Sequence, residues 1–206
     1  MSKFLHASVA VPAFLAVVAA APLAAQRGVD QPRIHAVELT FHGGYFQPTG
    51  TSGASPGVSL TRRSAWVGGA RFNAYAPGGR WGVEVAGSYS PERVLQSGTS
   101  GTLGTRRTNA LIGTAKAMLG RSPRKPGVSY MVGAGLGAFH RKKSVLDSNA
   151  KSTDITGVLS AMVRIPLDGQ VGLRLDADDL IYSADYGTGS KMRNDFVLTA
   201  GLGISW

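Results

Sequence analysis

Three histidines follow residue 25, and histidine is the side chain best suited to acid–base chemistry at neutral pH. They are His35, His42 and His140. A Ser-His-acid arrangement would make one of them the general base of an acyl hydrolase. None stands in a His-x-Ser pattern, and none forms a compact set with a serine and a carboxylate by position. We therefore predict no catalytic residues and interpret His42 as a polar residue of the interior.

Two other patterns have the composition of ligand sites. The glycine-rich run 133–137 has the spacing of nucleotide-binding motifs, but it lies within a segment of strand periodicity rather than at a strand-to-helix turn. Asp176, Asp178 and Asp179 could offer carboxylates to calcium, yet no glycine-containing ligand loop accompanies them. Pairing of these acids with nearby arginines is the better interpretation. We expect neither a metal site nor a cofactor.

The composition narrows the class of protein further. The chain has 206 residues, of which 28 are glycine and none is cysteine. The absence of cysteine excludes disulfide frameworks, thiolate metal sites and cysteine nucleophiles. The formal net charge of +10 would be typical of a protein that binds nucleic acid. We expect no such partner, because the N-terminal segment predicts export.

The first 25 residues have the three parts of a secretory signal peptide. Lys3 provides the positive charge, residues 7–21 form an apolar run, and small residues precede Gln26. We predict a cleaved signal peptide at 1–25 and a periplasmic lead-in at 26–34; the alternative is a membrane-anchoring helix. No later stretch reaches about 18 consecutive apolar residues. The exported chain could therefore cross a membrane only as a closed barrel.

Eight segments alternate apolar and polar residues, and each is close to the about 9–11 residues that a tilted membrane strand needs. They are residues 35–46, 65–76, 80–90, 106–119, 128–139, 154–165, 171–182 and 194–206. Long polar connections follow every odd-numbered segment, at 47–64, 91–105, 140–153 and 183–193. Short ones follow the second, fourth and sixth, at 77–79, 120–127 and 166–170. Such alternation is typical of outer-membrane barrels, with long external loops and short periplasmic turns.

We therefore predict an all-β fold over residues 35–206, namely a closed, eight-stranded, antiparallel, up-and-down transmembrane β-barrel. The polar face of the segments carries four acids and four bases, and their signs alternate over the first four segments. The interior of such a barrel is only wide enough for side chains, so its charges must pair. The alternative is the solvated face of a soluble sheet. The predicted lumen charge network consists of Glu38, Arg71, Glu84, Lys116, Arg164, Arg174, Asp176 and Asp178.

Aromatic residues gather near both ends of the predicted strands, as in the girdles at the two membrane–water interfaces. At the periplasmic ends they are Tyr75, Trp81, Tyr130 and Trp206. At the outer ends they are Tyr45, Phe46, Trp66, Tyr89, Phe139, Tyr182 and Phe196. Asp179 does not fit the pattern, because its parity is outward. It could lie at the interface, or a bulge could shift the register.

The whole pattern resembles the OmpA/OmpX-like family of eight-stranded outer-membrane barrels. Gly201, Ile204 and Trp206 resemble that family's C-terminal assembly signal. Because the chain stops at Trp206, we expect a bare barrel without a periplasmic domain. The resemblance implies residence in the outer membrane of a Gram-negative-type bacterium, with membrane lipid and the assembly machinery as partners. It also implies a structural or surface-interaction role, and we expect a monomer. The alternatives are a lipid A-modifying enzyme, a narrow channel or small-ligand binder, and a soluble secreted barrel.

Basic residues fall in or beside the predicted external loops. Lipopolysaccharide presents phosphates at this height, and arginine pairs bind phosphate through two hydrogen bonds. We predict that these residues contact lipopolysaccharide; ordinary solubilising charge is the alternative. The predicted contacts are Arg62, Arg63, Arg106, Arg107, Arg141, Lys142 and Lys143.

Overall fold

The computed structural model describes residues 37–49, 51–55, 58–98, 101–141, 153–185 and 190–206. The predicted signal peptide at 1–25 and the lead-in at 26–34 lie outside the described residues. Within the described part of the chain, no helix is long and apolar enough to cross a membrane. All the regular structure described is strand.

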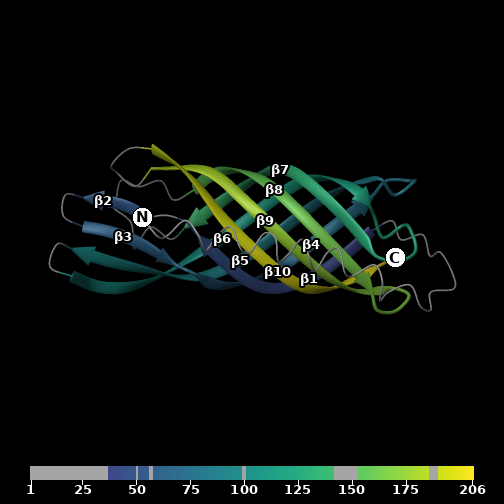
Figure 1. Ribbon diagram of the computed structural model, residues 1–206, viewed down its shortest axis with the longest axis horizontal. Coiled ribbons are helices and arrows are strands. Elements are labelled where there is room, and N and C mark those ends of the chain that lie inside the picture. The colour runs from purple at the N-terminus through teal and green to yellow at the C-terminus, as the bar shows by residue number, and fades with distance from the viewer. Residues whose placement is uncertain (1–36, 50, 56–57, 99–100, 142–152, 186–189) are drawn as a thin grey trace, which may run out of the picture.

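Ten antiparallel strands make up a single sheet (Figure 1). Their bounds are β1 Val37–Pro48, β2 Thr51–Ser55, β3 Val58–Arg63, β4 Ala65–Tyr75, β5 Trp81–Gly98, β6 Gly101–Arg121, β7 Ser129–Arg141, β8 Thr153–Pro166, β9 Val171–Asp185 and β10 Ser190–Ser205. Alternation of apolar and polar residues produces these strands, because successive side chains point to opposite faces of the sheet.

Eight of the strands close into a barrel. β1 pairs with β4 on one side and with β10 on the other. From β10 each strand pairs with the one before it in the chain, down to β6. β6 then pairs with β5, which pairs with β4 and completes the ring. The seam between β1 and β10 begins at Val37, whose backbone exchanges hydrogen bonds with Trp206 at 3.2 and 3.1 Å. The predicted closed, eight-stranded, antiparallel, up-and-down barrel is thus confirmed. Closure leaves no unpaired sheet edge along the wall, as a lipid environment requires.

The connections between consecutive strands are shorter at one end of the barrel than at the other. At one end, which we call the turn end, short turns join β4 to β5, β6 to β7 and β8 to β9. The opposite end, which we call the loop end, carries the remaining connections. There β5 and β6 extend far beyond their barrel neighbours, with 18 and 21 residues. β3 lies beside β5 at this end and β2 lies beside β3, opposite the C-terminus (Figure 1).

The extension at the loop end corrects two sequence predictions. Residues 47–64 and 91–105 were expected to be polar loops, but they contain β2, β3 and the outer parts of β5 and β6. The Ser-, Thr- and Gly-rich composition favoured a loop. However, Val58 to Thr61 also alternates apolar and polar residues, and β3 pairs with β5 from Val58↔Gly98 to Arg63↔Arg93. Pairing with an already formed strand overrides the weak local preference.

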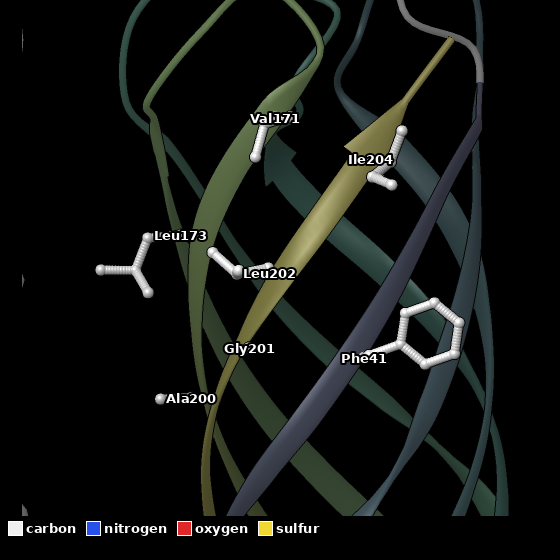
Figure 2. A pocket seen from close by; sticks show the side chains of 7 residues that line it. All are labelled: Phe41, Val171, Leu173, Ala200, Gly201, Leu202 and Ile204. Carbon is white, nitrogen blue, oxygen red and sulfur yellow. The ribbon is translucent and has the colours of Figure 1, made fainter.

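The outward faces of the barrel strands are apolar. Large exposed side chains occur on seven of the eight barrel strands, including Phe41, Val85, Leu136, Leu159 and Leu202, and the outward apolar residues of β9 are half-buried. A shallow apolar hollow lies on this wall across β1, β9 and β10, and its lining includes Phe41, Leu173 and Leu202 (Figure 2). Such a surface would be unfavourable in water at this extent, whereas it suits contact with lipid.

Four of the predicted girdle aromatics point inward instead. Outward exposure is found for Trp81, Tyr130 and Trp206 near the turn end and for Tyr45, Trp66 and Tyr89 near the loop end. Phe196 is half-buried. The physical reason for the exceptions is parity: Phe46, for example, lies four residues after the inward His42 and therefore shares its face. The inward-pointing residues are Phe46, Tyr75, Phe139 and Tyr182.

Candidate functional site

The lumen from the turn end to mid-height is filled by eight charged side chains, which we call the lower network. None of them is more than 5% exposed. They come from six different strands, and ion pairs link them across the barrel. Their members are the residues predicted from the sequence: Glu38, Arg71, Glu84, Lys116, Arg164, Arg174, Asp176 and Asp178.

Glu84 is the hub of the lower network. Its Oε1 lies 3.0 Å from Nη1 of Arg71 and 2.7 Å from Nζ of Lys116. Its Oε2 pairs with the guanidinium of Arg174. Because three cations converge on this one carboxylate, its negative charge is compensated from β4, β6 and β9 at once. Burying an ion without such partners would lower the stability of the folded barrel by about several kcal/mol, which is the penalty for removing the ion from water.

The remaining pairs extend from this hub in two directions. Toward the loop end, Asp178 lies 2.8 Å from Arg71 and 2.7 Å from Lys116. Toward the turn end, Arg174 lies 3.4 Å from Glu38, which also pairs with Arg164. Arg174 further lies 2.7 Å from Asp176. The four acids and four bases therefore form one connected, electrically balanced set.

Glycines on the inner face make room for these long side chains. A Cβ atom at Gly172 would lie 2.5 Å from Cζ of Arg164, and one at Gly203 would lie 3.0 Å from Cδ of Glu38. Lys116 likewise lies opposite Gly135 in the register of β6 and β7. Beside the network, Tyr75 and the methionines 118, 131 and 162 form a buried apolar cluster, and Met162 lies opposite Asp176 in the register of β8 and β9.

A second arrangement fills the lumen near the loop end; we call it the outer cluster. Phe139 stacks on Phe46 with ring centroids 5.8 Å apart and on Tyr182 at 5.5 Å. The Arg62 guanidinium lies 5.1 and 5.2 Å from the rings of Phe46 and Phe139. That of Arg141 lies 4.5 and 5.1 Å from the rings of Phe139 and Tyr182. Cations over aromatic faces are stabilised by the ring quadrupole, most strongly when desolvated.

Each arginine of the outer cluster also pairs with a buried carboxylate. Nη1 of Arg62 lies 2.6 Å from Oδ2 of Asp195 and donates to the Tyr182 hydroxyl at 2.7 Å. Nη2 of Arg141 lies 2.9 Å from Oδ2 of Asp154. Asp195 additionally accepts a hydrogen bond from the Thr49 backbone at 3.0 Å. The cluster thus connects β3 and the end of β1 to the barrel.

The outer cluster corrects the prediction for two of the basic residues. Arg62 and Arg141 were expected to contact lipopolysaccharide from the rim, but the two residues are 7% and 3% exposed and their side chains point into the lumen. The reason is that β3 and β7 continue through these positions, so that strand parity, and not loop freedom, directs the side chains. The inward parity of Phe46 and Phe139 was the signal that could have revealed this cluster.

The other predicted rim cations divide between exposed and undescribed residues. Arg63 and Arg107 are exposed on β3 and β6. The register places residue 93 of β5 directly between them, because Arg63 pairs with Arg93 and Arg93 with Arg107. Arg106 belongs to β6, where only its backbone is described, and Lys142 and Lys143 lie outside the described residues.

The histidines occupy places of different chemical character. Nε2 of His42 lies 3.0 Å from Oγ of Ser88 inside the lumen, which is a possible nucleophile–base pair. Its other ring nitrogen, Nδ1, has no hydrogen-bond partner among the described residues. His140 is exposed and lies 2.7 Å from Oγ1 of Thr153, whereas His35 lies outside the described residues.

The acids considered for calcium are separated by the barrel wall. Asp176 and Asp178 belong to the lower network, while Asp179 points outward, and the pairing of β9 runs through it without a register shift. Among the described residues, no group of three or more histidines or acids could hold a metal ion.

The three residues of the predicted assembly signal lie at the seam between β1 and β10. Gly201 lies on the inner face opposite His42, whereas Ile204 and Trp206 are exposed on the outer face.

Comparisons with known proteins give the fold but no family. No protein-family model and no curated protein matches the chain. Among solved structures, the outer membrane protein AlkL in lipid bilayers has a TM-score of 0.51 and 11% identity, covering 87% of this chain and 94% of that one. The outer membrane protein W of E. coli has a TM-score of 0.49 and 14% identity, covering 84% and 98%.

The attachment invasion locus protein Ail of Yersinia pestis, solved with the heparin analogue sucrose octasulfate, has a lower TM-score of 0.43 at 14% identity. It covers 82% of this chain and 99% of that one. At 11% identity the similarity to AlkL shows the fold alone. The chain has the fold of an eight-stranded outer-membrane barrel, and the resemblance to OmpA/OmpX-like barrels is confirmed at that level.

Proposed function

We propose that the protein is an integral outer-membrane barrel with a closed lumen, exported by a cleaved signal peptide, whose role is structural and surface-interacting. In this proposal it is a monomer without catalytic activity. The turn end faces the periplasm and the loop end faces outward, where the protein contacts lipopolysaccharide. The observation that carries the proposal is a wall that is apolar outside and filled with paired charges inside.

The filled interior supports a structural role rather than transport. The lower network and the outer cluster occupy different heights of the lumen, and each joins strands from opposite sides of the barrel. An eight-stranded barrel has an interior just wide enough for side chains. A continuous water path would have to displace both sets, exposing apolar rings in one and separating buried ions in the other.

Planar-bilayer recording tests the closed lumen. We expect no steady conductance above the lipid background for the purified barrel. A stable, ion-selective conductance in the unmodified protein would favour the channel alternative and contradict the closed lumen.

The outward surface at the loop end supports lipopolysaccharide contact. Arg63 and Arg107 are exposed above the aromatic residues Trp66 and Tyr89, and position 93 lies between them in the register. Aligned cations on neighbouring strands repel each other unless an anion bridges them. Lipopolysaccharide phosphates meet this requirement, because guanidinium groups bind phosphate through two directed hydrogen bonds.

Retention of lipopolysaccharide tests this contact. We expect the double variant Arg63→Gln/Arg107→Gln to co-purify several-fold less lipopolysaccharide than the unmodified barrel. The matched control is Arg80→Gln/Lys125→Gln, which removes the same charge at the turn end. Equal retention in all three proteins would contradict the proposed contact.

One observation favours a second candidate, an enzyme that modifies lipid A. The 3.0 Å pair of His42 and Ser88 could act as base and nucleophile. Two features support the non-catalytic proposal instead. The pair faces the filled lumen, and no described carboxylate orients His42 through Nδ1. Mass analysis of lipid A separates the two: a change that depends on the intact protein and is lost in His42→Ala would establish the enzyme.

A further inference from the structure

Four cations gather on two neighbouring turns at the turn end, and we call them the turn patch. They are Arg80, Arg121, Arg124 and Lys125. Arg80 is exposed and the other three are half-buried. In the described part of the chain, none of the four takes part in an ion pair. The patch therefore concentrates positive charge without internal compensation.

The two turns hold the patch in a fixed shape. The Gly120 backbone donates to the Arg80 carbonyl at 2.8 Å, and Ser122 donates to the Gly79 carbonyl at 3.0 Å. Gly79 has a positive φ of 62°, and a Cβ atom there would lie 3.2 Å from Cβ of Arg124. Glycine at this position thus serves both the turn and the close approach of the second turn.

Two of the cations are further oriented by backbone carbonyls. Nη1 of Arg124 donates to the Tyr75 carbonyl at 3.1 Å, and Nη2 of Arg121 donates to the Pro126 carbonyl. These contacts hold the guanidinium groups beside the turns while leaving further N–H groups to donate elsewhere. A binding surface that is ordered in advance loses less entropy when a ligand binds.

The patch continues directly into the apolar wall. Arg80 precedes Trp81, which pairs with Leu119, and Arg121 pairs with Tyr130. Trp81, Leu119 and Tyr130 are 56%, 63% and 55% exposed. A ligand that meets both features has an anionic group at the height of the turns and an apolar part beside the strands. A soluble polyanion satisfies only the first of these conditions.

We infer that the turn patch binds the phosphate of an anionic phospholipid in the periplasmic leaflet, with the acyl chains against the apolar wall that runs from Trp81 and Tyr130 toward the loop end. This rests on the membrane location and orientation proposed above. Guanidinium and ammonium groups attract a phosphodiester, and tryptophan and tyrosine prefer the headgroup level. The recognition depends on net headgroup charge, so phosphatidylglycerol binds in preference to the zwitterionic phosphatidylethanolamine.

Native mass spectrometry of the purified barrel, titrated with each lipid in turn, tests the inference. We expect more phosphatidylglycerol adducts than phosphatidylethanolamine adducts on the unmodified protein. Arg80→Gln/Arg121→Gln/Arg124→Gln/Lys125→Gln should reduce that preference about tenfold, because each cation near an anionic surface contributes to binding. The double variant Arg80→Gln/Lys125→Gln keeps the two carbonyl contacts of the turns. It should show an intermediate loss, which guards against misfolding of the quadruple variant.

The loop-end variant Arg63→Gln/Arg107→Gln removes the same charge as the turn-patch double variant, and it should keep more of the preference for phosphatidylglycerol than that double variant does. Equal binding of the two lipids by the unmodified protein would overturn the inference, as would an unchanged preference in both turn-patch variants. Binding of isolated peptidoglycan that needs the patch, with no lipid preference, would also overturn it. These outcomes are distinguishable from failure of the proposed function, because lipopolysaccharide retention and conductance are measured separately.

Discussion

The lower network and the outer cluster solve the same problem of buried charge in different ways. In the lower network every ion except Arg164 has two or three opposite charges around it, as Glu84 has Arg71, Lys116 and Arg174. In the outer cluster Arg62 pairs with Asp195, and its guanidinium lies over the rings of Phe46 and Phe139. The lower network is therefore a set of ions that compensate one another's charges, whereas the outer cluster is an aromatic core that contains two ion pairs.

This difference indicates different roles in stability. The lower network draws on six barrel strands, so its loss affects the whole barrel. The outer cluster contains Arg62 of β3 and the Asp195 contact to Thr49, which lie at the base of the extension. We infer that the lower network stabilises barrel closure and that the outer cluster mainly attaches the extension to the barrel.

The largest effect is expected when the hub of the lower network is neutralised. Glu84→Gln removes one charge that compensates three buried cations, and breaking a buried ion pair typically costs about 3–5 kcal/mol. The urea midpoint for unfolding in lipid vesicles should fall accordingly, and protection of backbone amides should decrease on all barrel strands.

A double variant serves as the control for this prediction. Glu84→Gln/Lys116→Met removes a cation together with the carboxylate and restores the charge balance. It should be more stable than Glu84→Gln alone, because the excess buried positive charge is gone. Additive losses from the two substitutions would show that the charges do not act as a coupled set.

A smaller and more local effect is expected for the outer cluster. Asp195→Asn removes the charge that pairs with Arg62 at 2.6 Å and weakens the acceptor for Thr49. Charge-assisted hydrogen bonds contribute roughly 1.5–3 kcal/mol each. Hydrogen exchange measured by mass spectrometry should rise in β3 and at the end of β1, while β7 to β9 near the turn end stay protected. Uniform loss of protection along the barrel would contradict the proposed division of roles.

Sequence reasoning could find the lower network because its signal is strictly local. Each of its residues lies on a strand with clear alternation, and the inward parity follows from the period of two. Sign alternation from Glu38 to Lys116 then indicated neighbouring strands, and the register places Glu84 directly opposite Lys116. No long-range information was needed beyond the up-and-down order of the strands.

The two arginines of the outer cluster could not be found in this way, although the parity of its aromatic residues was readable, because one arginine lies on an added strand and the other lies beyond the predicted end of a barrel strand. Arg62 lies on β3, which forms only by pairing with the extended β5. Composition favours a loop for that segment, and tertiary pairing overrides it. Arg141 lies at the end of β7, two residues beyond the predicted segment 128–139, and a boundary error of that size turns an inward strand position into a loop.

The smallest effect is expected outside the lumen, at Asp179. Its neighbour Asp178 points inward and lies 2.8 Å from Arg71, whereas Asp179 points outward and accepts only a long hydrogen bond from Asn194, 3.4 Å, among the described contacts. Asp179→Asn should change the free energy of unfolding in vesicles by at most about 1 kcal/mol, in the stabilising direction, because an acid on the lipid face near the interface costs little. Asp178→Asn should instead lower the free energy of unfolding, by several times the size of the change that Asp179→Asn produces. The two substitutions are chemically identical and adjacent in the chain, so they isolate the effect of facing the lower network. Equal effects would mean that strand position, and not pairing inside the lumen, determines what a buried carboxylate contributes.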